Sequence, residues 1–141
     1  MKILLAVDGS VYTTKSVKYL ATHLEWFKNE PELHLLHVKL PIPPGRVRAV
    51  AGKELIERYY QEETDAAMAP AERVLRKLAI PFQRSCKVGD IAKEIQAYAT
   101  KNKIDLIVMG SHGHGALKNL VMGSVATKVL ASTKTPVLIV R

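Results

Sequence analysis

The sequence predicts an α/β fold, a single-domain doubly wound parallel sheet of five strands with helices on both faces. Short apolar runs of strand length alternate along the chain with longer stretches whose apolar residues recur every three or four positions. Parallel strands need crossover connections, so this alternation is typical of a parallel sheet covered by helices on both sides. The chain has 141 residues, the length of one domain, and we expect that domain to span residues 1–141.

The first predicted elements are a strand, a helix and a second strand. Residues 3–7 and 32–38 are apolar runs suited to strands buried on both faces. Ser10 is the expected N-cap of a helix that continues to Phe27.

A loop and a long helix should follow. Prolines and a glycine at positions 41–45 exclude regular structure. The pattern is helical from about residue 50 to residue 79. Pro70 should kink or restart this helix, because proline lacks the N–H that the helix ladder uses.

The second half of the chain repeats the alternation. Residues 82–88 form an apolar-polar strand pattern, and Asp90 is placed to cap the helix that follows. Residues 105–109 are the fourth predicted strand, a helix follows Gly123, and residues 137–140 are the fifth strand.

The stretch at 110–124, GSHGHGALKNLVMGS, joins the fourth strand to the last helix. Glycines let a ligand approach backbone N–H groups, and a strand, a glycine-rich loop and a helix N-terminus together form an anion site. For any single glycine, a tight turn or a helix cap is the alternative. The spacing fits neither the dinucleotide fingerprint G-x-G-x-x-G nor the P-loop G-x-x-x-x-G-K-[ST].

The spacing that is present is G-x2-G-x9-G-S, formed by Gly110, Gly113, Gly123 and Ser124. It resembles the nucleotide-binding signature of the universal stress protein family, in the subgroup that binds ATP. The resemblance covers the chain from MKILLAVDGS to TPVLIVR and implies the strand order 3-2-1-4-5. Parallel sheets bind ligands beyond the carboxyl ends of their strands, where the strand order reverses. We therefore expect the turn after the first strand and the glycine-rich stretch to face one crevice.

The resemblance also implies individual roles. Asp8 would bind the ribose hydroxyls, although the residues alone favour a role in capping the first helix beside Ser10. The strand end before Asp8 would pass beneath the adenine, and the backbone of Val38 would contact the adenine edge. Ser124 is either the N-cap of the last helix or a phosphate ligand. The expected binding residues are Ala6, Val7, Asp8, Val38, Met109, Gly110, Gly113, Gly123, Ser124 and Val125.

Two histidines lie within the glycine-rich stretch. We expect His112 and His114 to be solvent-facing, with contact to phosphate, or to a divalent cation such as Mg²⁺ or Mn²⁺ accompanying ATP, as the alternative. No Cys, Asp or Glu stands nearby to complete a metal site, so none is predicted.

A basic segment follows the second strand. Residues 39–53 contain Lys39, Arg46, Arg48 and Lys53 but no acidic residue. We expect this segment to be a mobile loop that folds over the nucleotide, with Arg46 or Arg48 near phosphate. A solvated, disordered loop is the alternative.

Composition limits the remaining classes. The chain has 21 basic and 13 acidic residues and a net charge of +8, but no dense basic run with interleaved aromatic residues, so nucleic acid is not the expected partner. Cys86 is the only cysteine, which excludes an intrachain disulfide, and we expect its thiol to be buried. No apolar segment approaches the roughly 18 residues of a membrane span, and the apolar N-terminal run is too short for a signal peptide. The expected location is the cytoplasm.

The expected function is that of an ATP-binding regulatory module in the stress response. No carboxylate follows Asp105 to activate water, so no catalytic residue is predicted and ATP hydrolysis would be slow at most. A slow ATP hydrolase and a basic nucleic-acid-binding or structural protein are the alternatives. In the implied strand order residues 137–140 form an apolar edge, which predicts a homodimer through this strand unless a helix covers it.

Overall fold

The computed structural model describes residues 1–43, 45–115 and 121–141, with the backbone alone at 46–51. Pro44 and residues 116–120 of the glycine-rich stretch lie outside the described residues. The side chains of Arg46 and Arg48, which were expected near phosphate, lie outside them as well.

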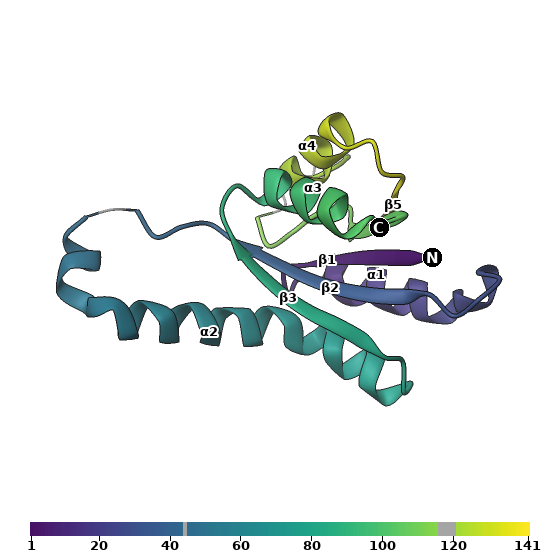
Figure 1. Cartoon of the computed structure of the whole chain (residues 1–141), viewed down its shortest axis with the longest axis horizontal. Coiled ribbons are helices and arrows are strands. Elements are labelled where there is room, and N and C mark those ends of the chain that lie inside the picture. The colour runs from purple at the N-terminus through teal and green to yellow at the C-terminus, as the bar shows by residue number, and fades with distance from the viewer. Residues whose placement is uncertain (44, 116–120) are drawn as a thin grey trace.

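A five-stranded parallel sheet forms the centre of the molecule, in the order β3-β2-β1-β4-β5 (Figure 1). The predicted fold class and strand order are therefore confirmed. At the carboxyl end of β1, Val7 pairs with His37 of β2, and Ala6 pairs with Met109 of β4. This is the point where the strand order reverses. The strands are β1 (Lys2–Val7), β2 (Glu32–Lys39), β3 (Phe82–Val88), β4 (Leu106–Gly110) and β5 (Val137–Val140).

Helices cover both faces of the sheet. Figure 1 shows α3 and α4 on one face and α1 and α2 on the other. Among the described residues, no helix combines the length and apolar character needed to cross a membrane. The helices are α1 (Val11–Thr22), α2 (Arg46–Lys77), α3 (Ile91–Asn102) and α4 (Ser124–Ser132), with a 3₁₀ turn η1 (Leu24–Trp26) after α1.

Alternation along the strands divides the core into two layers. In β1, Leu4 packs toward α3 and α4, whereas Ile3 and Leu5 pack toward α1 and α2. All three side chains are fully buried, as expected for a strand covered on both faces.

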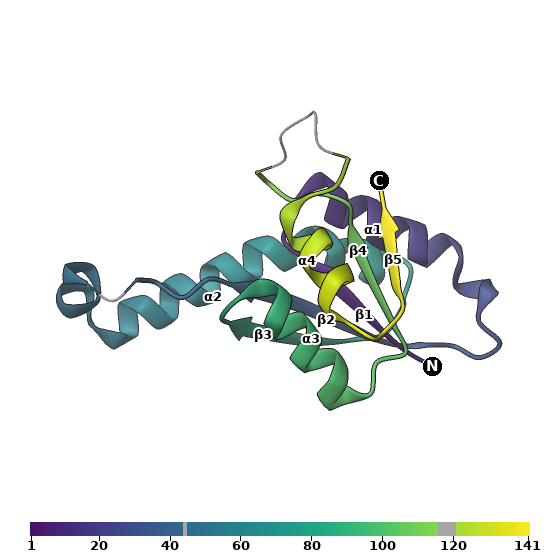
Figure 2. The same ribbon diagram turned by 90° about the horizontal axis from the view of Figure 1, so that it is seen from above.

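Helix α2 differs from its prediction. It continues through Pro70, because Met68, Ala71 and Leu75 are fully buried on either side of the proline and hold the helix against the sheet. The break lies instead at Gly52, whose backbone (φ 72°, ψ 161°) is accessible mainly to glycine. The N-terminal part of α2 extends well beyond the sheet (Figures 1 and 2).

Three further expectations were wrong. The first helix ends at Thr22 rather than at Phe27. The segment 39–53 is not one loop, because Lys39 belongs to β2 and is buried, and α2 begins at Arg46. Cys86 is exposed rather than buried, because β3 is an edge strand.

Candidate functional site

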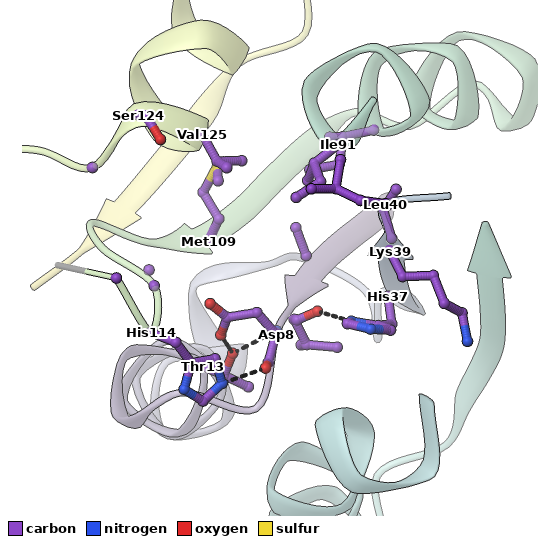
Figure 3. A pocket seen from close by; sticks show the side chains of 18 of the residues that line it. Asp8, Thr13, His37, Lys39, Leu40, Ile91, Met109, His114, Ser124 and Val125 are labelled. Carbon is purple, nitrogen blue, oxygen red and sulfur yellow. Dashed lines mark hydrogen bonds between the residues drawn. The ribbon is translucent and has the colours of Figure 1, made fainter. Parts of the chain in front are cut away.

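A cavity of about 590 Å³ opens at the carboxyl ends of β1, β2 and β4. Figure 3 shows Asp8 and Thr13 on one side of this pocket, Met109, Ser124 and Val125 on another, and Leu40 and Ile91 on a third. All ten residues expected to bind a ligand line this cavity: Ala6, Val7, Asp8, Val38, Met109, Gly110, Gly113, Gly123, Ser124 and Val125.

The turn between β1 and α1 is held by hydrogen bonds to Asp8. Its Oδ1 accepts the backbone N–H of Ser10 at 2.9 Å and the hydroxyl of Thr13 at 2.8 Å. Ser10 caps α1, as predicted, by accepting the N–H of Thr13 at 3.4 Å. The structural use of Asp8 therefore occupies Oδ1. Its Oδ2 has no hydrogen-bond partner within the described part of the chain.

Gly9 allows α2 to approach this turn. Its φ of +81° disfavours any side chain, and a Cβ at this position would lie 2.9 Å from the Cα of Ala67. The turn is thus pressed directly against α2.

The glycine-rich loop passes close to the same turn. A Cβ on Gly113 would lie 2.6 Å from Oδ2 of Asp8, and a Cβ on Gly110 would lie 2.5 Å from the Cβ of Tyr12. His114 donates a hydrogen bond from Nε2 to the carbonyl of Asp8 at 2.8 Å. Two segments about a hundred residues apart in sequence are therefore joined beside the cavity.

The start of α4 corrects one expectation. Gly123, not Ser124, is the N-cap residue, and no side chain of the described residues caps this helix. Gly123 is held by its N–H, which donates to the carbonyl of Ser111 at 2.8 Å. Ser124 is the first helical residue and is exposed, so its hydroxyl is not used as a cap. The first N–H groups of a helix have no partner within the helix, which leaves this end of α4 suited to an anion.

β2 forms the wall opposite α4. Val38 lines the cavity, and its side chain packs on the α3 and α4 face of the sheet. The neighbouring side chains point to the other face. There Nδ1 of His37 donates to the carbonyl of Val7 at 2.8 Å, and Nζ of Lys39 donates to the hydroxyl of Thr64 at 2.5 Å and to the carbonyl of Tyr60.

The sequence did not indicate the contribution of α2 to the cavity. Tyr59 and Glu63, one helical turn apart, line it together with the loop residues from Leu40 to Pro43. The only available signal was their i, i+4 spacing, which places them on one helix face. Nothing local indicates that this face meets the carboxyl ends of β1 and β2.

The two histidines of the loop are placed differently. His114 is exposed, as expected, whereas His112 is half-buried and its ring lies 5.2 Å from that of Tyr12. Nδ1 of His112 also contacts the hydroxyl of Ser111 at 2.9 Å. The described ranges contain no group of three or more His, Cys, Asp or Glu side chains arranged to hold a metal ion.

Comparison with known proteins shows the family. The sequence matches the universal stress protein family over residues 1–141, and the chain belongs to that family. It is 31% identical over 153 residues to universal stress protein YxiE of Bacillus subtilis, covering 99% of this chain and 98% of that protein. It is 29% identical over 140 residues to universal stress protein MJ0531 of Methanocaldococcus jannaschii, covering 99% of this chain and 81% of the relative.

Solved structures share the fold. The structure of MJ0577, also from M. jannaschii, superposes with a TM-score of 0.81 at 27% identity, covering 99% of this chain and 94% of that one. More distant members match the fold and were solved with adenine nucleotides. A universal stress protein from Archaeoglobus fulgidus is in complex with dAMP (TM-score 0.70, 20% identity, 100% and 98% coverage), and one from Arabidopsis thaliana has AMP bound (TM-score 0.67, 15% identity, 99% and 90% coverage). A further member is in complex with cAMP (TM-score 0.70, 20% identity, 100% and 97% coverage).

Proposed function

We propose that this chain binds an adenine nucleotide, ATP, in the cavity at the carboxyl ends of β1, β2 and β4, and acts as a nucleotide-dependent regulatory module of the stress response. The proposal treats residues 1–141 as one universal stress protein domain. The observation that carries it is the convergence of all ten residues expected from the G-x2-G-x9-G-S resemblance on one cavity. The location fits the general rule for parallel sheets, since the cavity lies where the strand order reverses.

Each part of the nucleotide has a suitable partner in this arrangement. Oδ2 of Asp8 would accept hydrogen bonds from ribose hydroxyls. The N–H groups at the start of α4 and in the glycine-rich loop, with the hydroxyl of Ser124, would bind phosphate oxygens. The backbone of Val38 would contact the adenine edge. A divalent cation, Mg²⁺ or Mn²⁺, would enter with the phosphates, because the described side chains form no three-ligand metal site.

Structural neighbours support the ligand class. Three members of the fold bind AMP, cAMP or dAMP, all of which contain adenine. A cytoplasmic location remains a prediction from the sequence.

Two glycine variants test the proposal. In Gly113→Ala the new methyl group would meet Oδ2 of Asp8, whereas Gly45→Ala is a matched control because nothing lies within 4 Å of its Cβ and Gly45 does not line the cavity. We expect Gly113→Ala to weaken ATP binding about tenfold or more by calorimetry, through loss of about one charge-assisted hydrogen bond. Gly45→Ala should bind as the unmodified chain does.

The same titration series identifies the nucleotide. Calorimetry with ATP, ADP, AMP and cAMP, and mass spectrometry of any nucleotide that copurifies, would establish the preferred ligand. Equal ATP affinity for both folded glycine variants would refute the site. Absence of binding by the unmodified chain to all four nucleotides would refute the function.

We also propose a homodimer through β5. This strand lies at one end of the sheet order, and its four side chains are all half-buried. Beside it, Val121 is 75% exposed, and its carbonyl accepts a hydrogen bond from Arg141 at 3.1 Å. An apolar edge with an exposed apolar neighbour favours pairing with a second copy.

A further inference from the structure

Helix α2 supplies one wall of the cavity, and none of the nucleotide contacts proposed above uses it. Tyr59 and Glu63, one helical turn apart, both line the cavity, and Tyr59 is 53% exposed. One further turn along the same helix face is Ala67, whose Cα would lie 2.9 Å from a Cβ on Gly9, the residue after Asp8. This face of α2 therefore leads from the turn after β1 to the mouth of the cavity. We call Tyr59 and Glu63 the α2 wall.

The α2 wall is held in place by the residues that directly follow its two members. The ammonium group of Lys39, at the end of β2, donates to the carbonyl of Tyr60 and to the hydroxyl of Thr64, 2.5 Å from Nζ. The Tyr60 hydroxyl accepts the backbone N–H of Ile42 at 2.9 Å, which holds the loop after β2 against the same helix. The wall is thus positioned before a ligand binds, which lowers the entropic cost of binding.

Glu63 brings an unused carboxylate to the cavity. Its side chain is half-buried, and it has no hydrogen-bond or ion-pair partner among the residues that the structure describes. Nε2 of His37 also lacks a partner in that part of the chain, but this atom is buried and is not offered to a ligand. An ionised carboxylate only accepts hydrogen bonds, so the α2 wall suits a ligand group that donates them.

The order of groups in a nucleotide assigns the base to this wall. The phosphates are proposed to lie at the start of α4 and the ribose at Asp8, so the base lies farther along the cavity, toward the end of β2. That end is lined by the apolar loop residues from Leu40 to Pro43 together with Tyr59. Apolar and aromatic side chains suit the faces of a base, whereas the charge of Glu63 would repel a phosphate.

We propose that the α2 wall binds the base and makes the cavity selective for a 6-aminopurine. In this arrangement Tyr59 stacks on the ring, and Glu63 accepts a hydrogen bond from the exocyclic amino group. The second hydrogen of that amino group remains for the backbone of Val38. A 6-oxopurine has a carbonyl oxygen at the same position, and this oxygen and the carboxylate would face each other without a donor. This inference rests on the proposed function, which places a nucleotide in the cavity.

Calorimetry with three triphosphates that differ in the group at position 6 of the purine tests the contact to Glu63. These are ATP, inosine triphosphate and purine riboside triphosphate, which has only a hydrogen at this position. We expect the full unmodified chain to bind ATP about tenfold more tightly than purine riboside triphosphate, through one hydrogen bond to a charged group, and to bind inosine triphosphate more weakly still. Glu63→Ala should bind ATP and purine riboside triphosphate equally.

Glu63→Gln provides a rescue. Its amide group donates to the oxygen of inosine triphosphate, so we expect the preference for ATP over this nucleotide to shrink about tenfold. Glu62→Gln is the matched control, because it removes the same charge from the neighbouring exposed position, which does not line the cavity. It should leave the preference unchanged.

Two variants test the stacking contact separately. Tyr59→Ala should weaken the binding of all three triphosphates about tenfold, because it removes the ring, whereas Tyr59→Phe keeps the ring and should bind as the unmodified chain does. Equal affinity of Tyr59→Ala and Tyr59→Phe would exclude stacking on the base.

The remaining outcomes separate this inference from the proposed function. Equal affinity of the unmodified chain for all three triphosphates would overturn the selectivity and leave nucleotide binding intact. A loss of affinity in Glu63→Ala that is seen with ATP but not with 2′-deoxy-ATP would assign Glu63 to the ribose and likewise overturn it. Absence of binding by the unmodified chain to any of these nucleotides would refute both.

Discussion

The two carboxylate oxygens of Asp8 have different surroundings. Oδ1 accepts hydrogen bonds from Ser10 and Thr13 and thereby holds the turn, whereas Oδ2 has no partner in the described structure and lies on the Gly113 side. The two uses that the sequence left open, helix capping and ligand binding, are therefore compatible in one side chain.

Substitutions at Asp8 separate these uses. Asp8→Asn keeps an oxygen for Ser10 and Thr13 but replaces Oδ2, so we expect a folded protein whose adenine-nucleotide affinity falls about tenfold. Asp8→Ala should lose both the hydrogen bonds of the turn and the ligand contact, so its free energy of unfolding should also fall by about 1–2 kcal/mol. Calorimetry and urea unfolding of both variants provide the comparison. Full nucleotide affinity in Asp8→Asn would exclude the ribose contact.

Single residues were predictable where a local rule applied. Ser10 and Asp90 are both helix N-caps, as their positions before apolar-periodic segments indicated. Of the two roles expected for Ser124, the N-cap role was wrong, because Gly123 takes the extended cap conformation and Ser124 lies inside the first turn. Tyr59 and Glu63 were missed because their place at the cavity depends on how α2 crosses the sheet, which no local pattern contains.

Among the elements, α2 shows tertiary packing prevailing over local propensity. Pro70 cannot donate to the carbonyl of Ala66, yet the helix remains continuous because its buried face packs on both sides of the proline. The proline is therefore a local cost within an otherwise stable helix.

Removing this cost should stabilise the protein. We expect Pro70→Ala to raise the free energy of unfolding by about 1–2 kcal/mol, because it restores a helix hydrogen bond and removes the ring clash. Ala69→Gly, at the neighbouring exposed position, is the control and should lower it by about 1 kcal/mol. Urea unfolding measures both, and an unchanged or lower value for Pro70→Ala would show that α2 is adapted to the proline.

The contact between α2 and β3 should depend on pH. The hydrogen bond from Arg84, followed by one from Gln61, holds the pKa of Asp65 below its ordinary value of 3.8. A carboxyl whose pKa is lowered on folding stabilises the protein above the ordinary pKa, and this contribution is lost as the pH falls through the folded-state pKa. The effect is small because the Asp65 side chain is 52% exposed.

The expected result is a pH-dependent difference between Asp65→Asn and the unmodified chain. Asp65→Asn should unfold at a lower temperature at pH 7, and the two melting curves should converge below pH 3.8. Glu62→Gln, which removes an exposed acidic group on the same helix, is the control and should show no such convergence. A constant difference across pH would assign the effect to packing rather than to charge.

For the molecule as a whole, the alternation of apolar runs was enough to predict a parallel α/β sheet, since each run has the length of a strand and each connection the length of a helix. The order 3-2-1-4-5 came from the family resemblance, because periodicity does not specify which strands are neighbours. The position of the cavity then followed from that order. The depth of the cavity and the contribution of α2 to its wall could not be predicted from the strand order, because they depend on the packing of side chains across the sheet.

The proposed dimer needs a test that spares the core. Replacing Leu138 and Val140 with lysine would not separate loss of the dimer from loss of the fold, because both side chains pack against the core on the α1 and α2 side. The backbone N–H of Ile107 donates to the carbonyl of Pro136, and that of Ser111 donates to the carbonyl of Val140. The backbone groups of the even-numbered residues of β5 therefore point toward β4. The N–H of Ile139 therefore faces the outer edge.

Ile139→Pro should consequently give a monomer, because it removes an edge N–H while the bonds to β4 remain. Ile139→Ala loses similar packing but keeps the N–H, and should remain dimeric. Light scattering at micromolar concentration measures both. A monomeric unmodified chain, or a dimeric Ile139→Pro variant, would contradict the proposal.

The projecting part of α2 has a mechanical consequence. Lys39 and the Tyr60 hydroxyl, which accepts the N–H of Ile42 at 2.9 Å, tether this helix to the end of β2 at one point. From Tyr60 back to Gly52 the helix extends about 12 Å at 1.5 Å per residue. A tilt about the tether would therefore be magnified toward Gly52, whereas Tyr59, which lines the cavity next to the tether, would move little. The tether thus separates the cavity wall from movement of the projecting part of the helix.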